Sequence, residues 1–151
     1  MREAVPHTLH PYRHDQRAVE GGLAFGDEAA AILGVESQQL FKTLIVVVDG
    51  ALACGVVPVA GHLDLKAFAA ASKGKRAEMA PPDAAQRATG YVIGGISPLG
   101  QKTRLPVLVD ETALLFDTVF VSAGKRGLQV ELAPADLLRL CAGRTAAIAA
   151  P

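Results

Sequence analysis

TLIVVVDGALACGVVP, residues 43–58, is the stretch that decides the fold. Its first six residues are aliphatic or β-branched and show no polar alternation, which is typical of a strand buried on both faces. Asp49-Gly50 is a strong signal for a two-residue hairpin turn, so residues 51–58 should return antiparallel to residues 43–48. The sequence therefore predicts a buried β-hairpin at the centre of the core.

Shorter elements are expected on both sides of this hairpin. Residues 7–12 are predicted to form an edge strand, because Pro11 cannot donate to a neighbouring strand. Asp27 and Asp64 are suited to cap helices, and prolines open two more. The expected helices cover 28–33, 65–71, 81–88 and 134–140, with a helical turn at 111–115 and strands at 106–109, 118–122 and 128–132. The alanine-rich tail is expected to be loosely held.

Short strands interleaved with short helices do not make a regular βαβ series. We therefore predict an α+β fold, in which a curled, barrel-like mixed sheet is surrounded by short helices. The chain has 151 residues, a length that favours a single domain over residues 1–151.

Charge and hydropathy exclude several classes of protein. Fifteen Lys and Arg balance fifteen Asp and Glu, which argues against a general nucleic-acid coat protein but allows a local basic patch. Three basic clusters are candidates for such a patch or for ordinary solvated charge: Lys73, Lys75 and Arg76; Lys102 and Arg104; Lys125 and Arg126. We find no signal peptide and no apolar run of ~20 residues, so we expect a cytoplasmic protein that contacts no membrane.

Two features could carry chemistry. Lys42 and Thr43 lie at the mouth of the buried strand, where the lysine either extends to solvent or presents a fixed positive charge to a cleft. Residues 94–100 (GGISPLG) form either an ordinary tight loop or a set of inward-pointing amides that could stabilise an oxyanion.

Other catalytic arrangements find little support. Ser97 lacks the G-x-S-x-G context of a serine nucleophile, and Cys54 and Cys141 look like reduced core thiols. His7, His10 and His14 follow no zinc-binding spacing. We therefore expect neither a metal nor a cofactor.

Five segments carry a resemblance to a known family. They are FGDEAA (25–30), FKTL (41–44), VPVAGHLDLK (57–66), AQRATGYVIGGISPLGQKTRLP (85–106) and GKRGLQVEL (124–132). In this order they resemble the YbaK/EbsC family, which is related to the editing domain of bacterial prolyl-tRNA synthetases. The resemblance implies the mixed curled sheet predicted above and a deacylase that clears Cys-tRNA(Pro) in trans, with prolyl-tRNA synthetase as a partner and no role for DNA.

The resemblance also implies roles for individual residues. Lys42 of FKTL would be the essential lysine, and the other matching positions would contact the substrate: Tyr12, Phe25, Thr43, Gly94, Gly95, Ile96, Ser97, Pro98, Ser122 and Gln129. Many members carry aspartate where Gln129 stands. For YbaK-type members the thiol of the substrate attacks its own carbonyl, so no protein nucleophile is required. A related hydrolase for Ala-tRNA(Pro), or a tRNA-binding module without activity, are the alternatives.

Overall fold

The computed structural model describes residues 6–11, 38–125 and 127–151. The predicted central hairpin is confirmed as β2 (Phe41–Val48) and β3 (Ala51–Pro58). Asp49 and Gly50 have φ values of 49° and 88°, the two positive angles that a type I′ turn needs to match the twist of its strands. The helix predicted at 28–33 lies outside the described residues.

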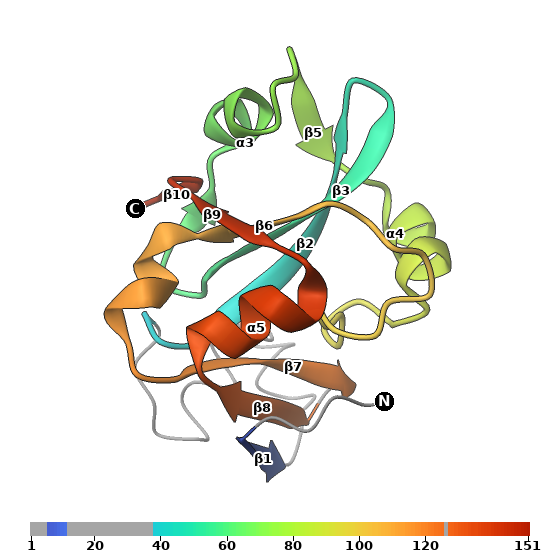
Figure 1. The fold of residues 1–151 in the computed structure, drawn as a ribbon. Helices are drawn as coiled ribbons and strands as arrows, with labels where there is room; N and C mark the ends of the chain where they lie inside the picture. The colour runs from blue at the N-terminus through green and yellow to red at the C-terminus, as the bar shows by residue number, and fades with distance from the viewer. Residues whose placement is uncertain (1–5, 12–37, 126) are drawn as a thin grey trace.

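This hairpin occupies the middle of a five-stranded sheet with the order β5-β2-β3-β6-β9 (Figure 1). β5 (Ala77–Met79) pairs antiparallel with β2, whereas β6 (Val107–Asp110) and β9 (Arg144–Ala146) run parallel to β3. The predicted mixed sheet is therefore present. β5 and β9 were not expected from the sequence.

A second sheet has the order β1-β8-β7. β7 (Val119–Lys125) and β8 (Leu128–Leu132) form the second predicted hairpin, and β1 (His7–Pro11) is its antiparallel edge strand, as the proline indicated. A parallel bridge between Leu40 and Phe120 joins this sheet to the start of β2. The two sheets therefore curl towards each other.

The predicted helices of the described residues are also confirmed. The Asp64 carboxylate accepts a hydrogen bond from the Ala67 amide at the start of α3 (Leu65–Ala71). α4 (Pro82–Thr89) begins at a proline, and a 3-10 turn η1 (Glu111–Leu115) precedes β7. α5 (Pro134–Cys141) lies between the two sheets in Figure 1. None of the helices in the described part of the chain is long and apolar enough to cross a bilayer.

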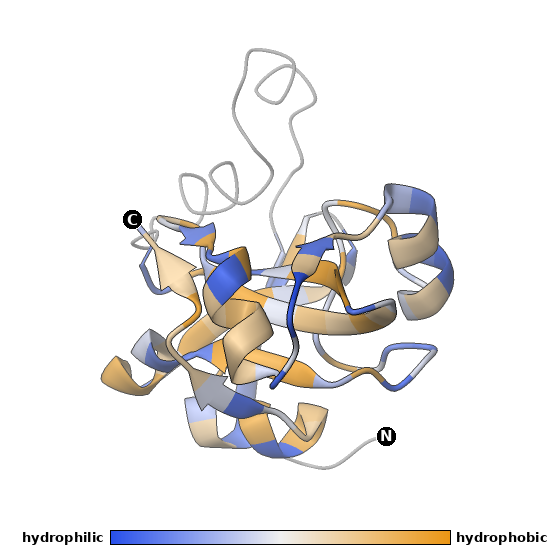
Figure 2. Cartoon of the chain, turned by 90° about the horizontal axis from the view of Figure 1, so that it is seen from above, coloured by the Kyte–Doolittle hydropathy of each residue, from blue (hydrophilic) through white to orange (hydrophobic). Residues whose placement is uncertain are grey.

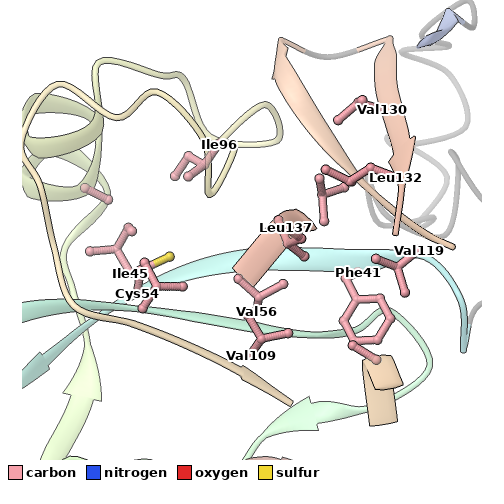
Figure 3. Packing of buried hydrophobic residues seen from close by; sticks show 14 residues of the cluster. Phe41, Ile45, Cys54, Val56, Ile96, Val109, Val119, Val130, Leu132 and Leu137 are labelled. Carbon is pink, nitrogen blue, oxygen red and sulfur yellow. The ribbon is translucent and has the colours of Figure 1, made fainter. Parts of the chain in front are cut away.

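The main core fills the space between the two sheets and α5. Leu137 of α5 packs in one cluster with Val56 and Val109 of the first sheet and Val119 and Val121 of the second (Figure 3). A second cluster around Phe68 packs α3 against the other face of the five-stranded sheet. Figure 2 shows the central strands as mainly hydrophobic, with hydrophilic residues on the outer loops and helix faces.

The prediction of a loosely held tail is wrong. Ile148 is fully buried, and β10 (Ala149–Ala150) pairs with β4 (His62–Leu63). The buried Asp110 carboxylate accepts hydrogen bonds from the amides of Ile148 and Ala149, at 3.0 and 2.9 Å. Alanine composition alone indicated looseness, but these backbone and side-chain contacts fix the end of the chain.

Candidate functional site

A cavity of about 520 Å³ follows the first half of β2, where the two sheets separate. Its floor consists of residues 40–45, and its walls come from α4, the glycine-rich loop and the β7–β8 hairpin. Lys42 is the only charged side chain among the described residues that line it. The arrangement is an apolar pocket with a few polar groups, which is the usual form of a small-ligand site.

The cavity lies along an open edge of β2. β5 pairs only with residues 46–48, and beyond it the Ala80 amide donates to the Ile45 carbonyl at 3.0 Å. Because backbone groups of an antiparallel strand alternate between its two edges, the amide and carbonyl of Thr43 point towards the same edge as those of Ile45. Main-chain groups of Thr43 are therefore directed at the cavity.

Lys42 and Thr43 both line the cavity, although successive side chains of a strand point to opposite faces. Both can do so because the cavity follows the strand edge. The Lys42 side chain is half-buried, and Thr43 is only 9% exposed. The Thr43 hydroxyl has no hydrogen-bond partner in the described structure, which costs free energy unless a ligand supplies one.

Ser122 and Gln129 form the part of the cavity wall that comes from the second sheet. They are register partners on β7 and β8, so their side chains share one face of the second sheet. Gln129 is 6% exposed, and its Oε1 atom likewise has no partner among the described residues. Two buried oxygens of the same cavity, from strands far apart in sequence, therefore both lack a partner within the described ranges.

The glycine-rich loop contributes less of the wall than predicted. Gly94 and Ile96 line the cavity, and Gly94 has a φ of 89° that favours glycine. Gly95, Ser97 and Pro98 are buried but do not line it. The Gly95 amide donates to the Val92 carbonyl at 2.9 Å, so this amide is committed to a turn and not free to bind an oxyanion.

Ser97 stabilises the glycine-rich loop through hydrogen bonds that do not face the cavity. Its hydroxyl accepts a hydrogen bond from the Leu99 amide at 3.1 Å, and its carbonyl accepts one from Gln101 Nε2 at 3.0 Å. The same Gln101 amide group lies 3.7 Å from the Cys54 sulfur in β3. Gln101 thus ties the loop to the central sheet, a role that sequence reasoning missed.

The two cysteines are free, as expected. Cys54 is fully buried, and this burial raises the pKa of its thiol to about 12. Burial also raises the pKa of the half-buried Cys141. Since the thiolate is the nucleophilic form, neither residue is suited to attack a substrate.

Other predicted positions lie elsewhere. Tyr12 and Phe25 lie outside the described residues, as does His14. His10 Nε2 is 2.8 Å from Glu131 Oε1. The pKa of the Glu131 carboxyl is lowered mainly by a hydrogen bond from the Thr118 hydroxyl and, to a smaller extent, by the hydrogen bond with His10. Within the described ranges no three His, Cys, Asp or Glu side chains gather as metal ligands.

Sequence reasoning also missed the apolar wall. Met79 of β5, Ala85 of α4 and Ile93 line the cavity together with the floor of β2. The period of α4 could have indicated that Ala85 faces inward. Nothing local in Ala77–Met79 indicates a strand, because its pairing with β2 depends on residues about 30 positions earlier.

Comparisons with known proteins agree with this fold and show the family. The model of the aminoacyl-tRNA editing domain matches residues 24–140. EbsC of Enterococcus faecalis (strain ATCC 700802 / V583), a candidate Cys-tRNA(Pro)/Cys-tRNA(Cys) deacylase by its name, is 38% identical over 149 residues, covering 98% of this chain and 90% of EbsC.

Solved structures share the fold. The crystal structure of a candidate trans-editing enzyme for prolyl-tRNA synthetase is 25% identical, with a TM-score of 0.82 and coverage of 96% of this chain and 87% of that one. That of hypothetical protein APE2540 is 23% identical, also with a TM-score of 0.82, covering 96% and 92%. The resemblance and the α+β fold predicted from the sequence are confirmed.

Proposed function

Because the chain belongs to the aminoacyl-tRNA editing domain family, we propose that it is a trans-acting deacylase that removes cysteine from Cys-tRNA(Pro). One observation supports placing this activity at the cavity. Lys42, the one charged side chain among the described residues that line the apolar cavity, shares it with two buried oxygens, Thr43 Oγ1 and Gln129 Oε1, that have no hydrogen-bond partner among those residues. The names of EbsC and of the similar trans-editing structure support the activity and the choice of prolyl-tRNA synthetase as partner.

The chemistry of a cysteinyl ester fits these groups. Its α-ammonium and the ribose hydroxyl can donate hydrogen bonds to Gln129 Oε1. The Thr43 hydroxyl can either donate a hydrogen bond to the substrate or accept one from it. The ester carbonyl is an acceptor for the Lys42 ammonium group and for the Thr43 amide at the open edge of β2. A bound substrate would therefore give partners to the two oxygens that have none in the described part of the chain.

The proposed reaction needs no attacking atom from the protein. The substrate sulfur forms a bond to its own carbonyl carbon, the bond from that carbon to the ribose oxygen breaks, and the thiol proton ends on the released ribose hydroxyl. Water then opens the cyclic thioester to give cysteine. Holding the thiol near the carbonyl supplies proximity, which is worth several kcal/mol in intramolecular reactions.

Charge stabilisation is the task assigned to the protein. Negative charge develops on the carbonyl oxygen, and a fixed cation in an apolar cavity stabilises it more than one in water. Of the loop amides first considered as donors, that of Gly95 is occupied, so Lys42 and the Thr43 amide take this role in the proposal. The buried Ser97 and Cys54 are consistent with a route that uses no protein nucleophile.

The first test is Lys42→Ala. We expect kcat for Cys-tRNA(Pro) to fall by at least ~100-fold, the usual effect of removing one group that stabilises an oxyanion. The matched control is Lys66→Ala, an exposed lysine of α3 away from the cavity, which should keep normal activity. Deacylation of labelled Cys-tRNA(Pro) measures both, and near-normal turnover by Lys42→Ala would refute the proposed role.

A substrate panel separates the chemical routes. We expect the protein to clear Cys-tRNA(Pro) and to leave Ala- and Ser-tRNA(Pro) intact, because only cysteine has a thiol that can cyclise. Alkylating the substrate thiol should abolish the reaction. Clearance of Ala-tRNA(Pro), or of the thiol-blocked substrate, would instead show a hydrolase that activates water.

A further inference from the structure

Positive charge is segregated in this chain, although its formal net charge is zero. Residues 84–109 and 118–130 contain no Asp or Glu, yet they carry five basic residues: Arg87, Lys102, Arg104, Lys125 and Arg126. Arg87 is compensated by Asp83, 3.1 Å away on the same helix. The remaining basic residues are in two loops far apart in sequence.

Tyr91 brings these two loops together. Its hydroxyl donates to the Leu99 carbonyl at 2.5 Å, inside the first loop. Its ring packs against the tip of the β7–β8 hairpin, so closely that a Cβ added to Gly124 would lie 2.9 Å from Tyr91 Cε1. A Cβ at Gly100 would lie 3.1 Å from the Tyr91 hydroxyl. The segments that carry Lys102 and Lys125 therefore both contact the side chain of Tyr91.

The segment after α4 has a hydrogen-bonded backbone, and both segments carry exposed basic side chains. The Lys102 amide donates to the Thr89 carbonyl at 2.9 Å, and the Thr103 amide donates to the Ala88 carbonyl at 2.8 Å. Lys102, Arg104 and Lys125 are all exposed. Because these bonds hold the backbone at Lys102, and Lys125 is a register partner of Leu128 in the β7–β8 hairpin, an anion that binds the two lysines need not order their main chain.

The cluster adjoins the cavity. Ile93 and Ser122 line the cavity, and each lies two residues from the Tyr91–Gly124 contact. We name Lys102, Arg104 and Lys125 the basic rim. In Figure 1 the end of β7 points to the same side of the molecule as the loop that follows α4.

We propose that the basic rim binds backbone phosphates of the tRNA 3′ strand as its aminoacyl end enters the cavity. This inference rests on the proposed function. A polynucleotide is favoured over an acidic protein because the cavity would take the terminal aminoacyl ester. The phosphates of that same strand must then pass along the cavity mouth. Neutralising them by Lys and Arg releases counterions, so the binding should depend on salt.

The test compares two double variants with the same change in charge. Lys102→Gln/Lys125→Gln alters the rim, and Lys73→Gln/Lys75→Gln alters the basic cluster between α3 and β5. Affinity for deacylated tRNA(Pro) is measured by fluorescence over a series of salt concentrations. We expect the rim variant to bind about 10-fold more weakly and its log–log salt slope to fall by ~1.4–1.8, the value for two lost phosphate contacts.

The control variant should bind within 2-fold of the wild type. A second substrate, 3′-cysteinyl-adenosine, carries no phosphate, so the rim variant should turn it over at the wild-type rate. An unchanged salt slope in the rim variant, or an equal loss in the control, would overturn the inference. Normal tRNA binding with loss of prolyl-tRNA synthetase binding would overturn it in favour of a protein partner.

These measurements also separate this inference from the proposed function. If the wild type deacylated no cysteinyl substrate, the function would fail, and binding of deacylated tRNA would still test the rim. If deacylation occurred with an unchanged salt slope, the rim alone would fail.

Discussion

Thr43 and Gln129 show at the scale of single residues how a site differs from a core. A buried oxygen without a partner costs ~1–3 kcal/mol, so folding alone does not favour either atom at its position. Both line the one cavity where a ligand could pair with them. Thr89 is the contrasting case: it is also buried, but its hydroxyl donates to the Ala85 carbonyl at 2.8 Å and accepts from the Tyr91 amide at 3.1 Å.

Thr43→Val tests this contrast. The substitution replaces the hydroxyl with a methyl group of similar size, so it removes an unpartnered polar atom without opening a cavity. We expect the free energy of unfolding to stay unchanged or to rise by up to ~1 kcal/mol, while kcat/KM for Cys-tRNA(Pro) falls. Urea denaturation and deacylation kinetics measure the two effects separately.

Thr89→Val is the matched control, since it removes a hydroxyl with two partners. It should lower the free energy of unfolding by ~1–3 kcal/mol. If Thr43→Val destabilised the protein as much as Thr89→Val, the Thr43 hydroxyl would have a structural partner and the argument from its isolation would be wrong.

Some residue-level features were accessible from sequence and others were not. Lys42 and Thr43 could be found because a polar pair at the start of an apolar strand conflicts with burial, and because FKTL matches the family. The role of Ser97 could not be predicted, because it depends on the orientation of its side chain, which bonds to the loop and does not line the cavity. Likewise, the glycine-rich composition does not predict that the Gly95 amide donates a hydrogen bond to the Val92 carbonyl.

At the scale of elements, too, some features could be predicted from the sequence and others could not. The Asp49-Gly50 turn and the Asp64 cap were predictable, since each depends on a few neighbouring residues. β5 and β9 were not, because three-residue strands are defined by distant partners and not by their own composition. The same limit applies to the contact between the hairpin tip and Tyr91.

Gly124→Ala tests this contact between elements. Gly124 has a φ of 109°, and a Cβ there would press on the Tyr91 ring. We expect a loss of ~2–4 kcal/mol in the free energy of unfolding, the sum of backbone strain and overpacking. Activity should also fall, because the Ser122 hydroxyl of the cavity wall accepts a hydrogen bond from the Gly124 amide at 3.3 Å, so a shift of Gly124 would displace Ser122.

Gly50→Ala provides the control for strain alone. Its φ is 88°, but nothing lies within 4 Å of the added Cβ. We expect a loss of only ~1 kcal/mol and unchanged kcat. Equal destabilisation by the two substitutions in urea denaturation would show that the Tyr91 contact contributes nothing.

The whole molecule is organised as two packed layers, one on each face of the central sheet. The cavity follows the edge of β2 and is walled by the second sheet, whereas Ile148 and Phe68 belong to the cluster on the α3 side. Asp110, at the end of β6, connects the tail to the central sheet. Stability and catalysis should therefore be separable by mutation, even in a chain of 151 residues.

Ile148→Ala tests this separation. The side chain is fully buried, so its truncation should lower the free energy of unfolding by ~2–4 kcal/mol. For a chain of this size, each kcal/mol corresponds to a shift in Tm of ~2–4 °C. Among the described residues no buried member of its cluster lines the cavity, and of the partly buried ones packed against it only Leu44 does, so kcat measured well below the new Tm should equal that of the wild type.

Leu115→Ala is the control at the same scale, because this leucine is 79% exposed and should change stability by less than ~0.5 kcal/mol. Calorimetry gives both Tm values, and deacylation at 25 °C gives kcat. An unshifted Tm for Ile148→Ala would mean that the tail is not part of the packed layer. A lower kcat in the folded variant would mean that a packing change on the α3 side of the sheet alters the cavity. β2 would connect the two, because it contributes residues to the α3-side cluster and to the cavity.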